Sequence, residues 1–237
     1  MTTKSMTHTS SVPQHVGLIL DGNRRWAREH GVTVAEGHKQ GYMNLKYIAK
    51  AGMKRGIKYL SAYVFSTENW NRDKEEVNGL MKLLSWVLKH EIKELHKEGI
   101  RVRIVGSKSK LKLGAAMVRA IIHAEELTKD NDRGTLLLCL DYGAHEQIVE
   151  AVKRIAKSGV APEDITADLI TENLDGDVPP LDLIVRTSGE QRLSNFMLWE
   201  AAYSELAFVP QHWPDFDEKA LDDVLADYAS RQRRFGK

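Results

Sequence analysis

Short apolar runs alternate with longer amphipathic segments along most of this chain. The apolar runs lie at residues 16–20, 57–65, 100–105, 135–140, 181–185 and 206–209. Between them, apolar residues recur at the spacing of a helix. Strands that alternate with helices favour a mainly parallel sheet, because parallel strands need long crossover connections. The pattern predicts an α/β fold in which about six strands are flanked by helices.

The helical spacing predicts helices at about 37–55, 74–97, 114–128 and 162–174, besides shorter ones. The segment from Lys74 to Lys97 has an unusually wide apolar face, with Leu80, Leu84 and Leu88 among its members. Two interpretations stay open. The face packs into an ordinary core, or it forms one wall of an apolar cavity.

The length and composition favour one domain. A chain of 237 residues suits one large α/β domain, and residues 15–230 contain no repeat or linker. Residues 1–14 are polar, so we expect a disordered leader ahead of a domain at residues 15–237. The leader lacks the apolar core of a signal peptide, and no run reaches the roughly 20 apolar residues that span a bilayer. We therefore expect a cytoplasmic protein.

Charge and cysteine content exclude several classes of protein. The formal net charge is only +1, which argues against a general nucleic-acid binder, so any phosphate binding must be local. Cys139 is the single cysteine, which rules out an intrachain disulfide or a thiolate zinc cluster. It lies in an apolar run, and we expect an inert core residue.

The stretch His15 to Trp26 changes from apolar to charged within one residue. Asp21 directly follows the first strand, at the edge where open α/β sheets bind ligands. Arg24 and Arg25 then begin a helix, and a helix start flanked by arginines binds anions. A carboxylate beside an anion site suggests Mg²⁺ held by one carboxylate and phosphate oxygens. The alternative is that Asp21 only caps the helix.

Further polar residues follow other predicted strands, and a parallel sheet brings them to the same rim. This rim would combine the arginines Arg25, Arg186 and Arg192 with the hydroxyls of Ser66 and Ser194 and the carboxylates of Asp21 and Glu205. Such a set suits a phosphorylated substrate and a metal. The neighbouring aromatic residues Trp26, Phe65, Trp70, Phe196 and Trp199 would accommodate an apolar body attached to the phosphate.

Other kinds of site find little support. The sequence has no phosphate-binding glycine loop of the nucleotide folds and no nucleophile elbow. His90 and Glu94 are one helical turn apart, which is typical of a solvated helix face. His38 opens a helix near the rim, where it acts either at the site or as a helix cap.

Five motifs together carry a resemblance. They are Asp21-Gly-Asn-Arg-Arg-Trp26, Gly37-His-Lys39, Phe65-Ser-Thr-Glu-Asn-Trp-Asn-Arg72, Arg186-Thr-Ser-Gly-Glu-Gln-Arg-Leu-Ser194 and Trp213-Pro-Asp-Phe-Asp217. From His15 to Gly236 the chain resembles the cis-prenyltransferases, the family of undecaprenyl diphosphate synthase. The resemblance implies a homodimer with an apolar tunnel between the second and third helices and the sheet.

The resemblance also implies roles for individual residues. Asp21 would act in catalysis with Asn69 and would bind Mg²⁺, with Glu205 near the metal. Asp21 would also bind the allylic diphosphate, aided by Gly22, Asn23, Arg25 and His38, and the second diphosphate would be bound by Arg186, Arg192 and Ser194. Arg24 and Trp26 would bind substrate as well. Phe65, Ser66 and Glu68 would bind substrate, and Asn69, Trp70 and Arg72 would bind it from a mobile loop over the site. Arg234 and Gly236 match a tail motif that reaches the partner's site.

Three features depart from the family pattern. An arginine that contacts the allylic diphosphate in many members is Val34 here, and the usual Asn-Tyr-Gly-Gly-Arg is Asp141-Tyr-Gly-Ala-His145. The small residue often found before Phe65 is Val64. These changes bear on the substrate and the product.

The main hypothesis is a Mg²⁺-dependent condensation of an allylic diphosphate with isopentenyl diphosphate to a short or medium cis-prenyl diphosphate. An alternative is the irregular, head-to-middle coupling of two allylic diphosphates, such as dimethylallyl and geranyl diphosphate. A non-catalytic partner subunit is the third interpretation, which the presence of Asp21 disfavours. A lipid product would add a peripheral membrane contact.

Overall fold

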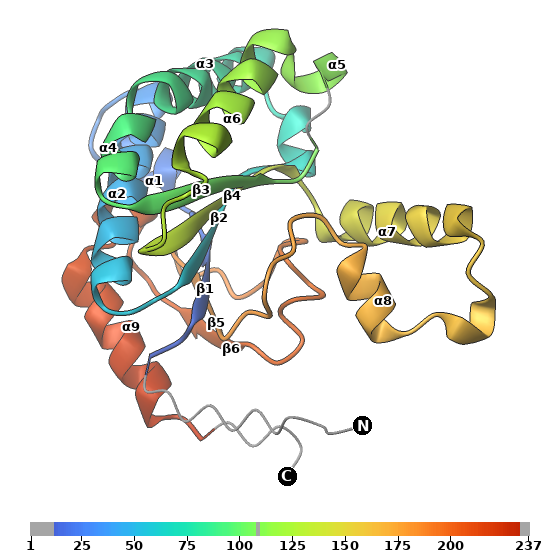
Figure 1. The fold of residues 1–237 in the computed structure, drawn as a ribbon. Coiled ribbons are helices and arrows are strands. Elements are labelled where there is room, and N and C mark those ends of the chain that lie inside the picture. The colour runs from blue at the N-terminus through green and yellow to red at the C-terminus, as the bar shows by residue number, and fades with distance from the viewer. Residues whose placement is uncertain (1–11, 108–109, 233–237) are drawn as a thin grey trace.

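A six-stranded sheet forms the centre of the computed structural model, which describes residues 12–107 and 110–232 (Figure 1). Its strands are β1 (His15–Ile19), β2 (Tyr59–Ser66), β3 (Ile100–Val105), β4 (Gly134–Tyr142), β5 (Leu183–Arg186) and β6 (Glu205–Phe208). Each pairing is parallel, and the strand order is β3-β4-β2-β1-β5-β6. The predicted α/β fold is confirmed.

Helices and 3₁₀ turns connect the strands. The helices are α1 (Asn23–Glu29), α2 (Val34–Lys54), α3 (Lys74–His90), α4 (Ile92–Lys97), α5 (Lys110–Leu113), α6 (Ala115–Thr128), α7 (Ala144–Ser158), α8 (Ala167–Glu172) and α9 (Glu218–Ser230), and the 3₁₀ turns are η1 (Thr67–Asn71), η2 (Pro162–Asp164) and η3 (Trp213–Asp215). Figure 1 shows α7 and α8 extending away from the rest of the molecule. Among the helices of the described ranges, none is both long and apolar enough to cross a membrane.

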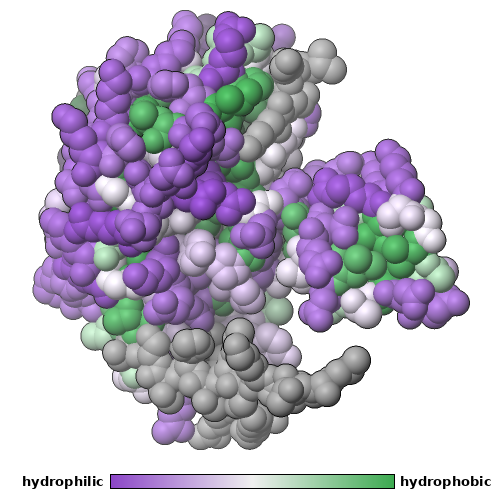
Figure 2. Space-filling model, viewed as in Figure 1, coloured by the Kyte–Doolittle hydropathy of each residue, from purple (hydrophilic) through white to green (hydrophobic). Residues whose placement is uncertain are grey.

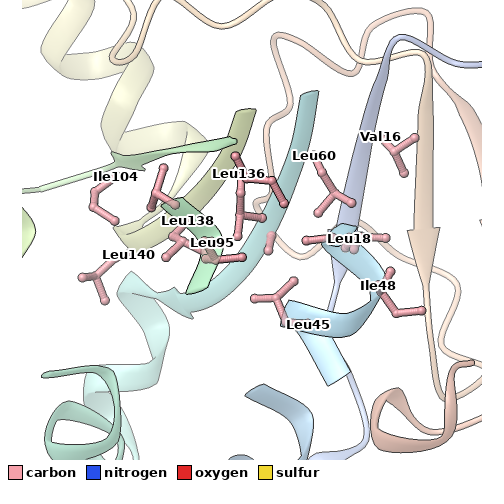
Figure 3. Close-up of a cluster of buried hydrophobic side chains, with 14 of the residues drawn as sticks. Val16, Leu18, Leu45, Ile48, Leu60, Leu95, Ile104, Leu136, Leu138 and Leu140 are labelled. Atoms are coloured by element: carbon pink, nitrogen blue, oxygen red, sulfur yellow. The ribbon is translucent and has the colours of Figure 1, made fainter. Parts of the chain in front are cut away.

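The larger core lies between the sheet and α2, α3, α4, α6 and α9. Figure 3 shows part of it, with Val16, Leu18, Leu60, Leu136 and Leu138 of the strands facing Leu45, Ile48 and Leu95 of the helices. A second, smaller core covers the other face, where Phe196 and Met197 of the segment after β5 are fully buried. Cys139 belongs to this second core and is also fully buried, as predicted.

Three helix boundaries differ from the prediction. Helix α2 begins at Val34 and not at Gly37, because Thr33 and Glu36 form a capping box. The segment from Lys74 to Lys97 is two helices that meet at Glu91, where both Glu91 and the nearby Glu94 bind Lys46 of α2.

The segment 162–174 is likewise not one helix. It is the short turn η2 followed by α8, because the Thr166 side chain accepts a hydrogen bond from the Leu169 amide and starts a new helix there.

Two bulges interrupt the pairing of β2 with β4. The Cα partners pass from Tyr63↔Cys139 to Phe65↔Leu140, so Val64 is an extra residue in β2. They then pass from Phe65↔Leu140 to Ser66↔Tyr142, which makes Asp141 an extra residue in β4. Bulges redirect side chains and occur often beside active sites. Here they fall on two of the positions that depart from the family pattern.

The chain ends need one correction. Pro13 is buried, and the Gln14 amide donates a hydrogen bond to Asp182 Oδ2 over 2.8 Å, so residues 12–14 are not a disordered leader. Residues 1–11 lie outside the described residues, as do Arg234 and Gly236 of the expected tail motif.

Candidate active site

The carboxylate of Asp21 lies between two arginines. Its Oδ1 accepts a hydrogen bond from Arg25 Nη2 over 3.0 Å, and its Oδ2 accepts one from Arg186 Nη2 over 2.9 Å. The N-cap of α1 is Gly22, which has no side chain to cap with. Asp21 is therefore not a helix cap, and that alternative is wrong.

The electrostatic surroundings keep Asp21 charged. Partial burial by itself would raise the pKa of this carboxyl group, but the hydrogen bonds and charges of Arg186 and Arg25 outweigh the burial and lower its pKa. The anion is already formed and oriented at neutral pH.

Gly22 is held against Ser188 and His212. A Cβ atom built on Gly22 would lie 2.0 Å from Ser188 Oγ and 2.7 Å from His212 Nδ1, and the backbone of Gly22 has a φ of +104°. Ser188 Oγ and His212 Nδ1 are 2.6 Å apart and hydrogen-bonded, and His212 Nε2 is 3.0 Å from Glu29 Oε1. The turn after Asp21 therefore requires glycine. This support joins three distant segments, so no local sequence pattern could predict it.

Arg186 organises the loop that follows β5. Its side chain is only 5% exposed and also donates to Ser194 Oγ over 2.8 Å and to the carbonyl of Arg192. The guanidinium of Arg192 is 60% exposed and pairs with Glu190. Arg186 thus has a fixed position, whereas the side chain of Arg192 is accessible to a ligand.

Two arginines and a histidine surround Glu76, in the first turn of α3. Arg72 Nη1 is 3.0 Å from its carboxylate, His38 Nε2 is 3.5 Å away and Arg24 Nη1 is 3.6 Å away. Glu76 is not among the site residues predicted from the sequence. The only local signal was its position four residues after Arg72, which allows a contact along one helix face.

His38 lies on α2 and points toward this group, while Thr33 caps the helix, so the capping role is wrong. Burial, and then the charge of Arg72, lower the pKa of His38 below its usual value despite the opposing effect of Glu76. His38 is therefore predominantly neutral at pH 7.

The turn η1 presents the third motif. The amide of Ser66 donates to Asn69 Oδ1 over 3.2 Å, and Asn195 Nδ2 donates to Glu68 Oε1 over 3.0 Å. Trp70 packs edge-on against Phe65, with ring centroids 4.9 Å apart. These contacts connect the turn to β2 and to the loop after β5.

Three cavities meet at Leu20 and Arg72, which line all of them. A polar cavity of about 350 Å³ is lined by Asp21, Gly22, Asn23, Arg24, Arg25, Arg28 and His38. A second, of about 610 Å³, is lined by Asp21, Ser66, Glu68, Asn69, Arg186, Arg192 and Ser194, among others. The third is mainly apolar, has a volume of about 110 Å³ and lies between α2, α3 and β2, where Val64, Leu80 and Leu84 line it. Both interpretations of the apolar face of residues 74–97 are therefore correct in part. The face packs into the core, and it also forms one wall of this cavity.

Several predicted site residues lie elsewhere. Glu205 begins β6 and pairs with Arg231 over 2.9 Å. The registers Val16↔Leu183 and Leu183↔Glu205 place it at the opposite end of the sheet from Asp21 within this chain. Trp26 donates to Asp215 and stacks on His30, and it lines none of the three cavities.

Two of the aromatic residues expected beside the ligand are also elsewhere. Phe196 is buried against Tyr63, and Trp199 donates a hydrogen bond to Thr171 of α8. The cavities are therefore less aromatic than the sequence suggested.

The residues present fit a magnesium ion held mainly by substrate. Within residues 12–107 and 110–232, no cluster of three or more His, Cys, Asp or Glu could hold a metal. Asp21 supplies one carboxylate that borders both polar cavities, and the buried Oδ1 of Asn23 has no hydrogen-bond partner among the described residues. Mg²⁺ is commonly bound by one or two carboxylates, phosphate oxygens and water, so this donor set suits it.

Comparison with known proteins identifies the family. The model of the undecaprenyl diphosphate synthase family matches residues 19–236. The chain belongs to this family. Isoprenyl transferase 2 of Bradyrhizobium diazoefficiens is 44% identical over 96% of this chain and 91% of its own length. Isoprenyl transferase of Clostridium perfringens is also 44% identical, over 95% and 90%.

Solved structures of this family agree with the fold. Lavandulyl diphosphate synthase from Lavandula x intermedia, in complex with dimethylallyl diphosphate, matches with a TM-score of 0.90 and 38% identity over 96% of this chain and 99% of that one. A protein from Campylobacter jejuni, described as a probable undecaprenyl diphosphate synthase, matches with a TM-score of 0.80 and 29% identity over 95% and 99%. As a member of this family, the chain is a prenyltransferase that forms a prenyl diphosphate.

Proposed function

We propose that this enzyme condenses an allylic diphosphate with isopentenyl diphosphate in a Mg²⁺-dependent reaction. The observation that carries the proposal is the meeting of two polar cavities and one apolar cavity at Leu20 and Arg72, with Asp21 between the polar ones. Two polar cavities give room for two diphosphates, and the apolar one accepts the prenyl chain. Binding both substrates side by side supplies the proximity that a bimolecular condensation needs.

In this proposal the cavity beside α1 binds the allylic diphosphate. The backbone amides at the start of α1, together with Arg24, Arg25 and neutral His38, stabilise the negative charge that grows on the departing diphosphate. Mg²⁺ held by Asp21 and the diphosphate would neutralise more of that charge.

The larger cavity binds the second diphosphate. Arg186 and Arg192 contact its phosphate oxygens, and the hydroxyls of Ser66 and Ser194 orient it. Asn69 borders both this cavity and the apolar one, where the reacting carbons would meet. The apolar walls keep water from the carbocation-like centre.

The size of the apolar cavity supports a short or medium product. Val64 projects into it from the β2 bulge, and Leu84 faces it from α3. Tyr42 and Leu45 line both this cavity and a further apolar space of about 10 Å³ that lies toward α4. A longer chain would have to displace these side chains.

Irregular coupling of two allylic diphosphates is the second candidate. The TM-score of 0.90 with lavandulyl diphosphate synthase favours it, as does Val34, which replaces a cation with an apolar residue at the start of α2. Under this reading, the larger cavity takes an allylic diphosphate in place of isopentenyl diphosphate.

We also propose that the enzyme is a cytoplasmic homodimer. Val149 and Val152 of α7 and Ile165 before α8 are each more than 40% exposed, and Figure 2 shows an apolar patch on this protruding part. A second copy of the chain would cover such a patch. Contact with a membrane surface would arise only through an apolar product. Sedimentation should show two chains per particle, and a monomer at micromolar concentration would contradict the proposal.

One assay tests the proposed reaction. The protein and Mg²⁺ are incubated with dimethylallyl, geranyl or farnesyl diphosphate, each with and without isopentenyl diphosphate, and the products are identified by mass and NMR. Linear cis products that need isopentenyl diphosphate are expected. Branched products formed without it would replace the first proposal by the second, and the absence of any prenyl product would contradict both.

A further inference from the structure

We propose that Asp141 is a positioning residue that holds Trp70, and through it the turn η1, in place over the substrate cavities. The inference rests on the proposed function for its kinetic part only. It starts from the bulge in β4. Because Asp141 is an extra residue against β2, its side chain leaves the regular alternation of the strand and turns toward Trp70.

The contact itself is short and buried. Trp70 Nε1 donates a hydrogen bond to Asp141 Oδ1 over 2.6 Å, and the Asp141 side chain is 0% exposed. The two residues are 71 positions apart in sequence, so the bond ties η1 directly to the end of a central strand. Without it, a partly buried indole N–H and a buried carboxylate would each lose a partner.

The backbone of Asp141 is held in an unfavourable conformation. Its φ is +48°, which non-glycine residues adopt rarely, and its carbonyl accepts a hydrogen bond from the Ser107 amide over 3.2 Å. Gly106 packs so closely that an added Cβ would lie 2.3 Å from the Leu140 carbonyl oxygen. The surrounding structure thus fixes this residue, and a fixed anchor can position a surface turn.

The position of Trp70 determines where its neighbours Asn69 and Arg72, which line the cavities, are placed. Asn69 precedes it and borders the apolar and the larger polar cavity, while Arg72 borders all three. The carbonyl of Asn69 accepts a hydrogen bond from the Arg72 amide over 3.1 Å. Holding Trp70 therefore holds both neighbours at the junction where the substrates would meet.

The contact with Trp70 requires an acceptor oxygen on residue 141 and does not require a negative charge. Lys112 Nζ is 3.6 Å from Asp141 Oδ1, and its side chain is 55% exposed, so this ion pair is weak. An amide oxygen would serve the indole equally well. Asp141→Asn should therefore retain the function, whereas Asp141→Leu should not.

The structural test needs no substrate. In protein labelled with ¹⁵N-tryptophan, each of the five tryptophans gives one indole signal, and Trp70→Phe assigns that of Trp70. Asp141→Leu should shift the Trp70 signal and speed its hydrogen exchange at least tenfold, leaving the other four unchanged, while Asp141→Asn should keep the protection. An unchanged Trp70 signal in Asp141→Leu would overturn the proposal.

The kinetic test uses the same variants. Asp141→Leu should lower kcat/KM for both diphosphates at least tenfold, and Asp141→Asn should stay within about threefold of the wild type. Lys112→Met and Glu150→Gln change groups that line the neighbouring cavity and should behave as the wild type. If Asp141→Asn or Lys112→Met were as impaired as Asp141→Leu, the charge would matter and the proposal would be wrong.

Two further variants separate the loss of this hydrogen bond from a general folding defect. Should Asp141→Leu fail to fold, Trp70→Phe removes the same bond from the other side and leaves β4 intact. In a variant that carries both changes, the losses should not add, because each single change breaks the same bond. Fully additive losses would contradict the proposal. If the wild type forms no prenyl product, the proposed function fails while the indole signals still decide whether Asp141 holds Trp70.

Discussion

Arg186 at the end of β5 donates a hydrogen bond to Asp21 at the end of β1, with 2.9 Å between Nη2 and Oδ2. The two residues are 165 positions apart and come together because β1 and β5 are paired neighbours in the sheet. The arginine is almost completely buried, so the carboxylate is oriented before a substrate arrives.

Asp21→Ala should lower kcat at least 100-fold and leave the fold intact. The carboxylate acts on metal and diphosphate, while no core side chain changes. The free energy of unfolding should fall by about 1–3 kcal/mol, because Arg186 loses a buried charged partner. Steady-state kinetics and urea denaturation measure both effects.

Asp222→Ala, which removes an arginine-paired carboxylate from α9, is the control. Retention of more than about a tenth of kcat, roughly 1.4 kcal/mol of barrier, would rule out the metal role.

Arg192→Lys should raise KM for the second diphosphate about tenfold and change kcat less. Lysine keeps the charge but loses the planar pair of donors that matches phosphate oxygens. Initial rates at varied isopentenyl diphosphate give both constants. Arg133→Lys alters an arginine that is paired with Glu98 away from the cavities and should have no effect. An unchanged KM for Arg192→Lys would place this residue outside the binding site.

Val64→Ala and Leu84→Ala should each shift the products toward longer chains. Both side chains line the apolar cavity. Shortening either side chain would enlarge this closely packed cavity, so that it accepts a longer prenyl chain. Mass spectrometry of the prenyl products gives the distribution. Ile122→Ala, on the exposed face of α6, should leave it unchanged. Wild-type distributions in both cavity variants, with normal folding, would mean that another feature limits the chain length.

The unfolding free energy should rise with pH between about 4 and 6.5 because of His15. Burial lowers the pKa of this histidine to about 4, and its ring contacts the Pro179 carbonyl and Ser61 Oγ. The unfolded chain binds the proton in this range while the folded protein does not, so the stability is lost as the pH falls. The expected change is about 3 kcal/mol.

Urea denaturation at pH 4.5 and pH 7 measures this effect, and a His15→Gln variant should show a smaller difference between the two values. Equal pH dependence in the variant and the wild type would exclude His15 as the cause. His96→Gln alters a histidine on α4 and serves as the control.

The strands and their shared rim could be predicted from the sequence. Apolar runs such as 16–20 indicate strands that are buried on both faces of a parallel sheet. The carboxyl ends of such strands lie along one edge of the sheet. The sequence pattern alone therefore predicts that Asp21 and Arg186 lie near each other. The motifs around Asp21, Arg72 and Ser194 then indicated the family, which the comparisons confirm.

Tertiary structure decided what depends on contacts between distant segments. The bulges at Val64 and Asp141 arise from the register of β2 against β4, and the helix break at Glu91 goes with pairing to Lys46. Glu76 belongs to the site because Arg24, His38 and Arg72, which come from different segments, converge on it. Hydrophobic periodicity measures local burial over one or two turns of chain, so it determined which residues form strands and helices. It carries no information on strand register or on ion pairs between remote residues, and only the folded chain could set these.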